Sequence, residues 1–282
     1  MLIHKSSTDI GVVFAVQSTG ITSYNAFEAL KGLEDQTVYE FGIIPFSTEI
    51  TGIADFPNND IVVPLGGTKL ITMDEERHLP PNWTLFYHDV GFRYHHCVRM
   101  QEQRMLNWDN EYATLGETLD RTFREDVFIK PDDDRKMFTG FVVSAGLTLR
   151  QELGQQMHQE LVDSAPIIIS PVKKILAEYR VVVSFNRIVG ISQYQKNGRL
   201  EPAAVTDMDT ILRISQFVGE AHSRFYPADV YVIDVADVPS SWQHRHPMKI
   251  VEYNCFNCSG LYKIDRKQMY NAIHRDLVEY WR

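Results

Sequence analysis

The sequence has few cysteines and no long apolar run. Its three cysteines, Cys97, Cys255 and Cys258, are too few for the disulfide framework of a secreted domain and fit a reducing compartment. No apolar stretch approaches the roughly 18 residues that a helix needs to cross a bilayer, and the first residues lack the apolar core of a signal peptide. These absences predict a cytoplasmic protein with no membrane partner.

An excess of positive charge is also missing. The 28 lysines and arginines are outnumbered by 37 aspartates and glutamates, which gives a net charge of −9. This balance disfavours non-specific electrostatic binding of nucleic acid. A nucleic-acid acceptor delivered by a local basic patch stays open, with Arg93, Arg99 and Arg104 as its first candidates, although a solvated face is the simpler interpretation of these arginines.

A CxxC motif is present at residues 255–258, but it does not predict a zinc centre. A structural zinc site needs about four ligands, usually from two such pairs. The remaining cysteine, Cys97, is distant in the sequence, and the spacing of His244 and His246 fits no zinc pattern. These residues more simply belong to the fold.

Two short, β-branched apolar runs near the C-terminus are the most informative segments. Residues 230–235 and 249–254 each have the composition of a buried strand. The first contains Asp234. The second contains Glu252 and Asn254, which share a strand face because they are two residues apart. If the strands are neighbours, three oxygen ligands converge and suit Mg²⁺, with space left for phosphates. The alternative is two ordinary strands with polar residues near their ends.

The N-terminal third predicts an α/β unit. Apolar runs at residues 11–16, 43–46 and 61–64 have the composition of buried strands, and residues 23–33 carry apolar side chains at helical spacing. Strands separated by helical segments favour a layered βα arrangement. A chain of 282 residues can bury roughly 74% of its unfolded surface, so a core needs no disulfide or metal.

Two lysines follow in the middle of the chain. Residues 126–131 have the pattern of a strand that ends in Lys130 and a proline. A lysine at the end of a buried strand is costly to bury unless it is paired. A phosphate would satisfy it, and so would a carboxylate such as Asp132 or Glu178. Lys136 follows in a polar turn and, taken alone, is most simply a solvated loop residue.

A proline-containing bend separates the next two apolar strands, at residues 166–172 and 175–183. Backbone groups freed at such a bend can contact the edge of a planar heterocycle. Glu178 and Arg180 share one face of the second strand. There an acid could accept hydrogen bonds from ribose hydroxyls, and an arginine could bind phosphate with its planar fork. A solvated ladder of the two charges is the alternative.

Taken in order, these segments resemble the ATP-grasp superfamily of carboxylate–amine or carboxylate–thiol ligases, and most closely the clade named for one arginine and two lysines, found in phage and bacterial proteins. The resemblance begins near residue 124 and ends near residue 265. It implies an α/β N-terminal domain (1–120) followed by a two-lobed α+β ATP-grasp domain (N-lobe 121–172, C-lobe 173–282). The motifs that carry it are residues 129–131, Lys136 with 138–140, 170–172, 177–180, Asp234, 251–254 and 259–262.

The resemblance implies that ATP is bound between the two lobes. Lys130 would contact the α- or β-phosphate, and Lys136, on a mobile loop, the β- or γ-phosphate. Arg180 would bind a phosphate or the acyl-phosphate intermediate, which makes these three the implied catalytic residues. The loop after Lys130 is acidic rather than glycine-rich, which departs from a phosphate-binding cradle.

The other implied contacts serve the nucleoside and the metal. Glu178 would hold the ribose, and the bend would contact adenine through its backbone. The interval of 18 residues between Asp234 and Glu252 includes an insert at residues 242–247, which could form part of the acceptor site. The implied adenine contacts are Ser170, Pro171 and Val172, and the implied Mg²⁺ ligands are Asp234, Glu252 and Asn254.

The implied reaction is ATP-dependent ligation of a carboxylate to an amine through an acyl phosphate, with small-molecule or peptide substrates and with ADP and phosphate as products. The protein would act mainly by positioning and charge neutralisation. Two alternatives stay open. One is a kinase or other phosphotransferase on the same scaffold, which would make a stable phosphoester. The other is a nucleotide-binding regulatory protein without turnover. The sequence identifies neither the substrates nor the oligomeric state.

Overall fold

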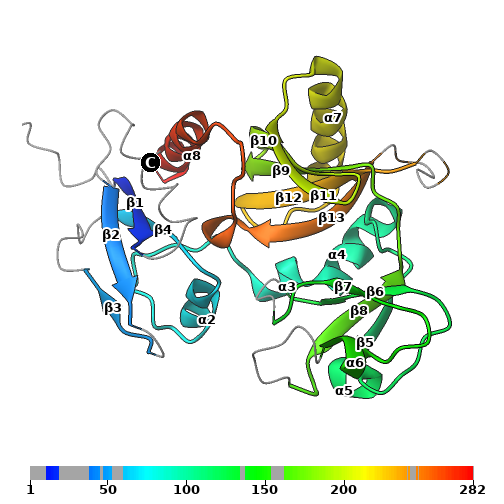
Figure 1. Ribbon diagram of the computed structural model, residues 1–282. Coiled ribbons are helices and arrows are strands. Elements are labelled where there is room, and N and C mark those ends of the chain that lie inside the picture. The colour runs from blue at the N-terminus through cyan, green and yellow to red at the C-terminus, as the bar shows by residue number, and fades with distance from the viewer. Residues whose placement is uncertain are drawn as a thin grey trace, which may run out of the picture.

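Three β-sheets form the frame of the molecule (Figure 1). The computed structural model describes residues 11–18, 38–44, 47–52, 60–133, 137–153, 162–239, 241, 246 and 248–281. The three sheets follow one another along the chain; one apolar cluster joins the first sheet to the third, whereas another lies within the second. An α/β N-terminal sheet followed by two antiparallel sheets confirms the predicted fold class.

The N-terminal sheet is mostly parallel, with the strand order β3-β2-β1-β4. The central strand β1 is parallel to β2 and β4, and β3 is antiparallel to β2. Phe14, Ala15 and Val63 are at most 1% exposed, as expected of parallel strands covered on both faces. The elements are β1 (Val12–Gln17), β2 (Val38–Ile43), β3 (Ile50–Thr51), β4 (Ile61–Leu65) and α2 (Lys69–Glu75).

Two elements predicted for this unit, a strand and a helix, fall wholly or partly outside the described residues. The strand predicted at residues 43–46 overlaps β2 at Ile43 alone, where β2 ends, and residues 45 and 46 lie outside the described residues. The helix predicted at residues 23–33 lies outside the described residues.

The second sheet is antiparallel, with the order β5-β8-β6-β7. It begins upstream of residue 124, because β5 pairs with β8. Glu111 and Tyr112 are exposed on this edge strand, so β5 lacks the apolar pattern that would have marked it in the sequence. The elements of this unit are β5 (Glu111–Thr114), α5 (Leu115–Thr118), β6 (Val127–Pro131), β7 (Phe141–Val143), α6 (Leu149–Leu153) and β8 (Pro166–Pro171).

A short helical segment connects the first two sheets and packs against the third. Leu106 donates its backbone N–H to the oxygen of Ile250, and Met105 forms a bridge with the same residue. The chain therefore passes along the third sheet before it enters the second. The elements are α3 (Asp89–Phe92), α4 (Tyr94–Gln101) and η2 (Glu102–Arg104).

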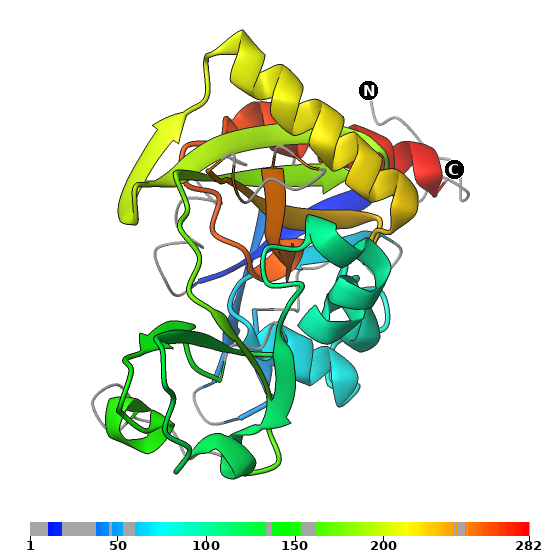
Figure 2. The same cartoon turned by 90° about the vertical axis from the view of Figure 1, so that its right-hand side faces the viewer.

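The third sheet is antiparallel, with the order β11-β10-β9-β12-β13. Figure 2 shows α7 crossing one side of this sheet, with the second sheet lying on the other side of the molecule. Among the helices of the described residues, none combines the length with the hydropathy of a membrane-spanning segment. The elements are β9 (Ala177–Ser184), β10 (Arg187–Lys196), β11 (Arg199–Ala204), α7 (Met208–Arg224), β12 (Val230–Asp237), β13 (Met248–Cys255), η4 (Phe256–Cys258) and α8 (Arg266–Tyr280).

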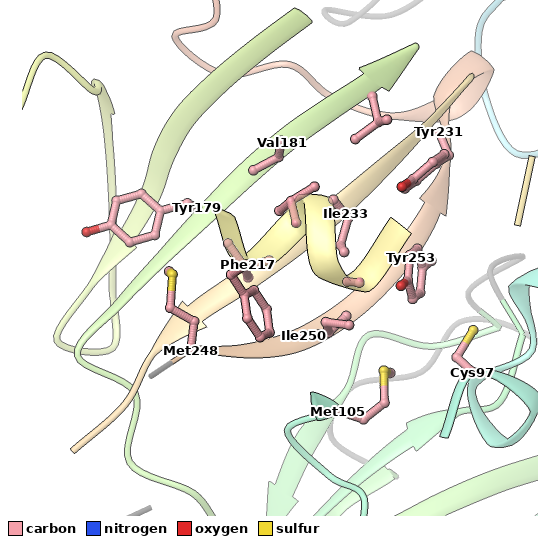
Figure 3. Packing of buried hydrophobic residues seen from close by; sticks show 14 of the residues in the cluster. Cys97, Met105, Tyr179, Val181, Phe217, Tyr231, Ile233, Met248, Ile250 and Tyr253 are labelled. Atoms are coloured by element: carbon pink, nitrogen blue, oxygen red, sulfur yellow. The ribbon is translucent and has the colours of Figure 1, made fainter. Parts of the chain in front are cut away.

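Strand alternation divides the two sides of the third sheet. Val181, Ile233 and Ile250 point toward Phe217 of α7 and form one apolar cluster (Figure 3). The residues between them on β9 and β12 point to the opposite face. That opposite face, here called the cleft face, carries Glu178, Arg180, Asp234, Glu252 and Asn254. The two strands predicted to carry the metal ligands, β12 and β13, are neighbours, as their predicted convergence required.

Candidate functional site

The centre of the cleft face is a charged row across three neighbouring strands. The register places Arg180 of β9 opposite Asp234 of β12, and Asp234 opposite Glu252 of β13. Arg180 binds Asp234 bidentately, with Nε–Oδ1 at 2.9 Å and Nη2–Oδ2 at 2.7 Å. Burial opposes the charged form of Arg180, but the adjacent Asp234 carboxylate outweighs it and raises the pKa of the guanidinium.

Asn254 completes the oxygen set predicted for Mg²⁺. Its Nδ2 donates to Oδ2 of Asp234 at 3.2 Å. The Asp234 carboxylate thus accepts three hydrogen bonds, and a carboxylate offers about four acceptor positions, so room for a metal contact remains. Two carboxylates and one amide are a donor set that fits Mg²⁺. No cluster of three or more His, Cys, Asp or Glu suited to a metal occurs among the described residues, so the amide of Asn254 is needed.

Lys130 reaches the row from the second sheet. It lies on β6, and its Nζ contacts Oε2 of Glu252 at 2.5 Å and lies 4.6 Å from the centre of the Tyr94 ring. The pair joins β6 to β13 at a pocket of about 200 Å³ that Thr139 and Gly140 also line. The sequence suggested Asp132 or Glu178 as the carboxylate partner. The structure instead pairs Lys130 with Glu252.

Asp132, the other suggested partner, is held elsewhere. It is fully buried, and its carboxylate accepts hydrogen bonds from the backbone N–H of His95 at 2.8 Å and from the His95 ring at 2.6 Å. These bonds fix the end of β6 to the start of α4. Asp132 therefore positions the strand that carries Lys130 and does not neutralise Lys130.

Glu178 lies one step along β9 from the charged row. It is 5% exposed, and the Tyr194 hydroxyl donates to its Oε2. Burial raises the pKa of Glu178 to about 7. The Tyr194 hydrogen bond opposes this rise, while the negative charges of Asp234 and Glu252 add to it. Glu178 is thus near its ionisation midpoint at neutral pH and can accept hydrogen bonds from ligand hydroxyls.

Aromatic rings surround the Arg180 guanidinium. Its carbon lies 5.6 Å from the centre of the Tyr194 ring and 5.1 Å from that of Tyr262, and the two rings stack with centroids 5.1 Å apart. Nη1 donates to the oxygen of Gly260 at 2.7 Å. Tyr262 has a φ of 47°, which is unusual for a bulky residue and typical of functional sites. Of the residues around Arg180, the sequence predicted only those of the motif at 259–262. It gave no local signal for Tyr194, or for Tyr94 beside Lys130.

The remaining predicted nucleotide contacts lie at or beyond the end of β8. Ser170 is buried, and its Oγ has no hydrogen-bond partner among the described residues. Pro171 and Val172 are exposed, so this bend has free surface for a ligand. Lys136 lies outside the described residues, and so does most of the insert at residues 242–247.

A larger pocket, of about 520 Å³, lies between the N-terminal sheet and the segment after β13. Leu65 and Gly66 line it at the end of β4, next to β1, where the strand order of the parallel sheet reverses. Such switch points are the usual ligand sites of open α/β sheets. Gly260, which accepts from Arg180, lines the pocket too. Lys263 and Arg266 are its only charged lining residues in the described part of the chain.

Comparisons with known proteins agree with this geometry. A family model for an ATP-grasp domain, described as family 2 of the clade named for one arginine and two lysines, matches residues 108–272, more than half of the chain. A search among curated proteins gave no match. Similar solved structures include D-alanine–D-alanine ligase from Bacillus anthracis, with 9% identity, a TM-score of 0.60 and 96% of each chain covered.

Two other structural neighbours have closely similar values. D-alanyl-alanine synthetase A from Vibrio cholerae has 12% identity and a TM-score of 0.61, over 97% of this chain and 98% of that one. VanG D-Ala:D-Ser ligase from Enterococcus faecalis has 11% identity and a TM-score of 0.58, over 97% of this chain and all of that one. At these identities the likeness shows a shared fold.

Proposed function

The chain belongs to family 2 of the ATP-grasp clade named for one arginine and two lysines, and from this premise we propose that it is an ATP- and Mg²⁺-dependent ligase that joins a carboxylate to an amine. The observation that carries the proposal is the row Arg180–Asp234–Glu252, which Lys130 reaches from the opposite lobe. Two cations and two carboxylates brought together between two lobes suit a magnesium-bound polyphosphate.

Each residue of the row has a proposed task. Lys130 and Arg180 bind phosphate oxygens, and Lys136 contributes from its loop. Asp234, Glu252 and Asn254 hold Mg²⁺, which supplies charge neutralisation at the phosphates when bound. Because Lys130 and Glu252 form an ion pair, their proposed contacts to phosphate and metal would replace this pair when the nucleotide binds.

The nucleoside would extend from this row toward the bend after β8. Glu178, two residues from Arg180 on the same strand face, accepts hydrogen bonds from the ribose hydroxyls. The bend at Ser170, Pro171 and Val172 contacts the base. Glu178 carries out this task best when ionised, since a carboxylate is a stronger acceptor than a carboxylic acid.

The second substrate would occupy the pocket at the end of β4. The pocket touches Gly260 and so adjoins Arg180, and its cationic lining suits a small molecule or peptide that carries a carboxylate. In the proposed reaction the γ-phosphoryl group passes to a carboxylate oxygen. The amine then attacks the acyl phosphate, forming the C–N bond and releasing phosphate, while ADP is the other product.

The test is an incubation of the protein with Mg·ATP and pooled amino acids, short peptides and small carboxylates, followed by nucleotide analysis and mass spectrometry. The expected products are ADP, phosphate and an amide. The Glu252→Gln variant removes a metal-binding charge at nearly constant shape and should lose most of this activity, whereas Glu201→Gln on the exposed edge strand β11 should retain it. A stable phosphoester would indicate a kinase, AMP as the only nucleotide product would exclude the acyl-phosphate route, and nucleotide binding without turnover would indicate a regulatory protein.

A further inference from the structure

Lys249 is a buried lysine on the cleft face that the proposed metal and phosphate contacts do not use. It lies on β13 opposite Ala236 of β12, which in turn lies opposite Glu178 of β9. It is 2% exposed. Its ammonium donates to the backbone oxygen of Gln103 at 2.7 Å, and within the described part of the chain no carboxylate pairs with it.

One neutral partner among the described residues leaves this ammonium under-satisfied. Lysine has three N–H donors and no acceptor, and burying a charge without a counter-charge is costly. Burial, and after it the positive charge of Lys173, lowers the pKa of Lys249. A buried cation held in this way gains from any ligand that offers a hydrogen-bond acceptor.

The space beside Lys249 combines apolar walls with polar groups. It measures about 220 Å³, and its lining consists in equal numbers of apolar residues (Leu106, Trp108, Pro171, Val238) and polar or charged residues (Asp109, Lys173, Ser241, Lys249). The apolar side chains offer surface to a planar heterocycle, and the polar groups offer hydrogen bonds to its edge. Lys173, between β8 and β9, forms an ion pair with Asp109, which precedes β5. These two segments connect the second sheet to the rest of the chain, so the pocket lies where the two lobes join.

The distance from the charged row also suits a nucleobase here. Val238 lies four residues after Asp234 on the continuation of β12, which corresponds to about 13 Å along a strand. This separation is of the order of that between the base and the terminal phosphates of an extended nucleoside triphosphate.

We propose that Lys249 is a specificity-determining residue that donates a hydrogen bond to a ring nitrogen of the purine of bound ATP. This inference rests on the proposed function, because it takes the phosphates to lie at the Asp234–Glu252 row. It assigns to a side chain of β13 a task that the sequence assigned only to the backbone of the bend.

The experiment compares two ligands that differ in whether they carry a base. Calorimetry would measure the binding of Mg·ATP and of Mg·tripolyphosphate to the wild-type protein, to Lys249→Met and to the control Lys174→Met. Lys174 is exposed on the same linker and does not line the pocket. Lys249→Met should raise the Kd for Mg·ATP about tenfold or more. It should leave the Kd for tripolyphosphate within about twofold, and Lys174→Met should change neither by more than about twofold.

Each other outcome is decisive. An unchanged Mg·ATP affinity in Lys249→Met, or an equal loss for both ligands, would overturn the inference while leaving the phosphate site in place. A wild-type protein that binds neither ligand would instead remove the proposed function itself. If Lys249→Met does not fold, Lys249→Gln keeps a donor for the Gln103 oxygen and serves the same comparison.

Discussion

The two faces of the third sheet differ in chemistry at the charged row, although the same strands build both. Toward α7 the side chains of β9 and β12 are apolar, and Val181 and Ile233 are fully buried against Phe217 (Figure 3). Toward the second sheet the neighbouring positions are Arg180 and Asp234, which are almost as deeply buried. The cleft face also carries Val182 and Val232, which are buried in the apolar cluster shared with the N-terminal sheet. Neither burial nor the strand face alone therefore separates structural positions from functional positions in this sheet; the position along the strand matters as well.

The comparison also shows how a strand can carry charge without losing its place in the core. Paired buried charges seldom stabilise a fold, because the cost of taking them from water offsets their attraction. The face toward α7 contributes apolar burial, whereas the cleft face combines apolar burial at Val182 and Val232 with the charged row at Arg180 and Asp234. This division predicts that substitutions toward α7 change mainly stability and that substitutions in the charged row change mainly ligand binding, with one exception.

The exception, and the largest expected effect, is Asp234→Ala. It would abolish turnover and would also leave the Arg180 guanidinium buried without its bidentate partner, which costs about 3–5 kcal/mol of unfolding free energy. Urea unfolding would measure this loss. The double variant Arg180→Met/Asp234→Leu, which removes both charges, should recover much of the stability but none of the activity. A single variant as stable as the wild type would contradict the role of this pair.

Phe217→Ala tests the opposite face. Phe217 is 2% exposed at the centre of the α7 cluster, and truncating a buried phenylalanine costs about 3–5 kcal/mol. Below its unfolding transition, the variant should bind Mg·ATP with wild-type affinity, because no cleft-face side chain loses a partner. A matched change at the exposed Leu212 of the same helix, Leu212→Ala, should cost less than about 0.5 kcal/mol. A large loss of ATP affinity in Phe217→Ala would show that the two faces are coupled.

The sequence predicted the cleft face better than its surroundings. Asp234, Glu252 and Asn254 could be placed together because residues two apart share a strand face and because both runs are strongly β-branched. The partner of Lys130 could not be predicted, since Glu252 lies 122 residues away and only the packing of two lobes brings it near. Asp132 was the nearer carboxylate in sequence, but the strand geometry turns it toward His95.

Residues without a local signal were missed. Tyr194 and Tyr262 meet beside Arg180 only because β10 and the loop after η4 approach the same strand, and a tyrosine in a strand is ordinary by itself. β5 was missed because an exposed edge strand lacks the apolar pattern. Lys249 was within a predicted strand, yet its burial depends on the chain of residues 102–108 lying along β13, which no sequence period encodes.

The free energy of unfolding should depend on pH through one residue of the cleft face, Glu178. The pKa of Glu178 is about 7 in the folded protein and has an ordinary value of 4.5 when unfolded. Between these values the folded state binds more protons, so stability falls as pH rises through this window. Relative to Glu178→Gln, the wild type should lose up to about 3 kcal/mol between pH 4.5 and pH 7 and little more above it.

Unfolding free energies from urea titrations at pH 5, 6, 7 and 8 would test this. Glu201→Gln, an exposed change on β11, is the control and should follow the wild-type curve. Parallel curves for Glu178→Gln and the wild type would mean that Glu178 is ionised throughout. In that case the Tyr194 hydrogen bond would outweigh the burial of the carboxylate.

Among the charged residues of the proposed site, Lys130 has the smallest expected effect on stability. The side chains of the Lys130–Glu252 pair are 14% and 22% exposed, so solvent screens the pair more than the Arg180–Asp234 pair. Lys130→Met should therefore change the unfolding free energy by less than about 1 kcal/mol. The same variant should raise the Kd for Mg·ATP about tenfold, because a charge-assisted contact to phosphate is lost. Lys267→Met, an exposed change on α8, should alter neither quantity, and a Lys130→Met protein that binds Mg·ATP as tightly as the wild type would remove Lys130 from the nucleotide site.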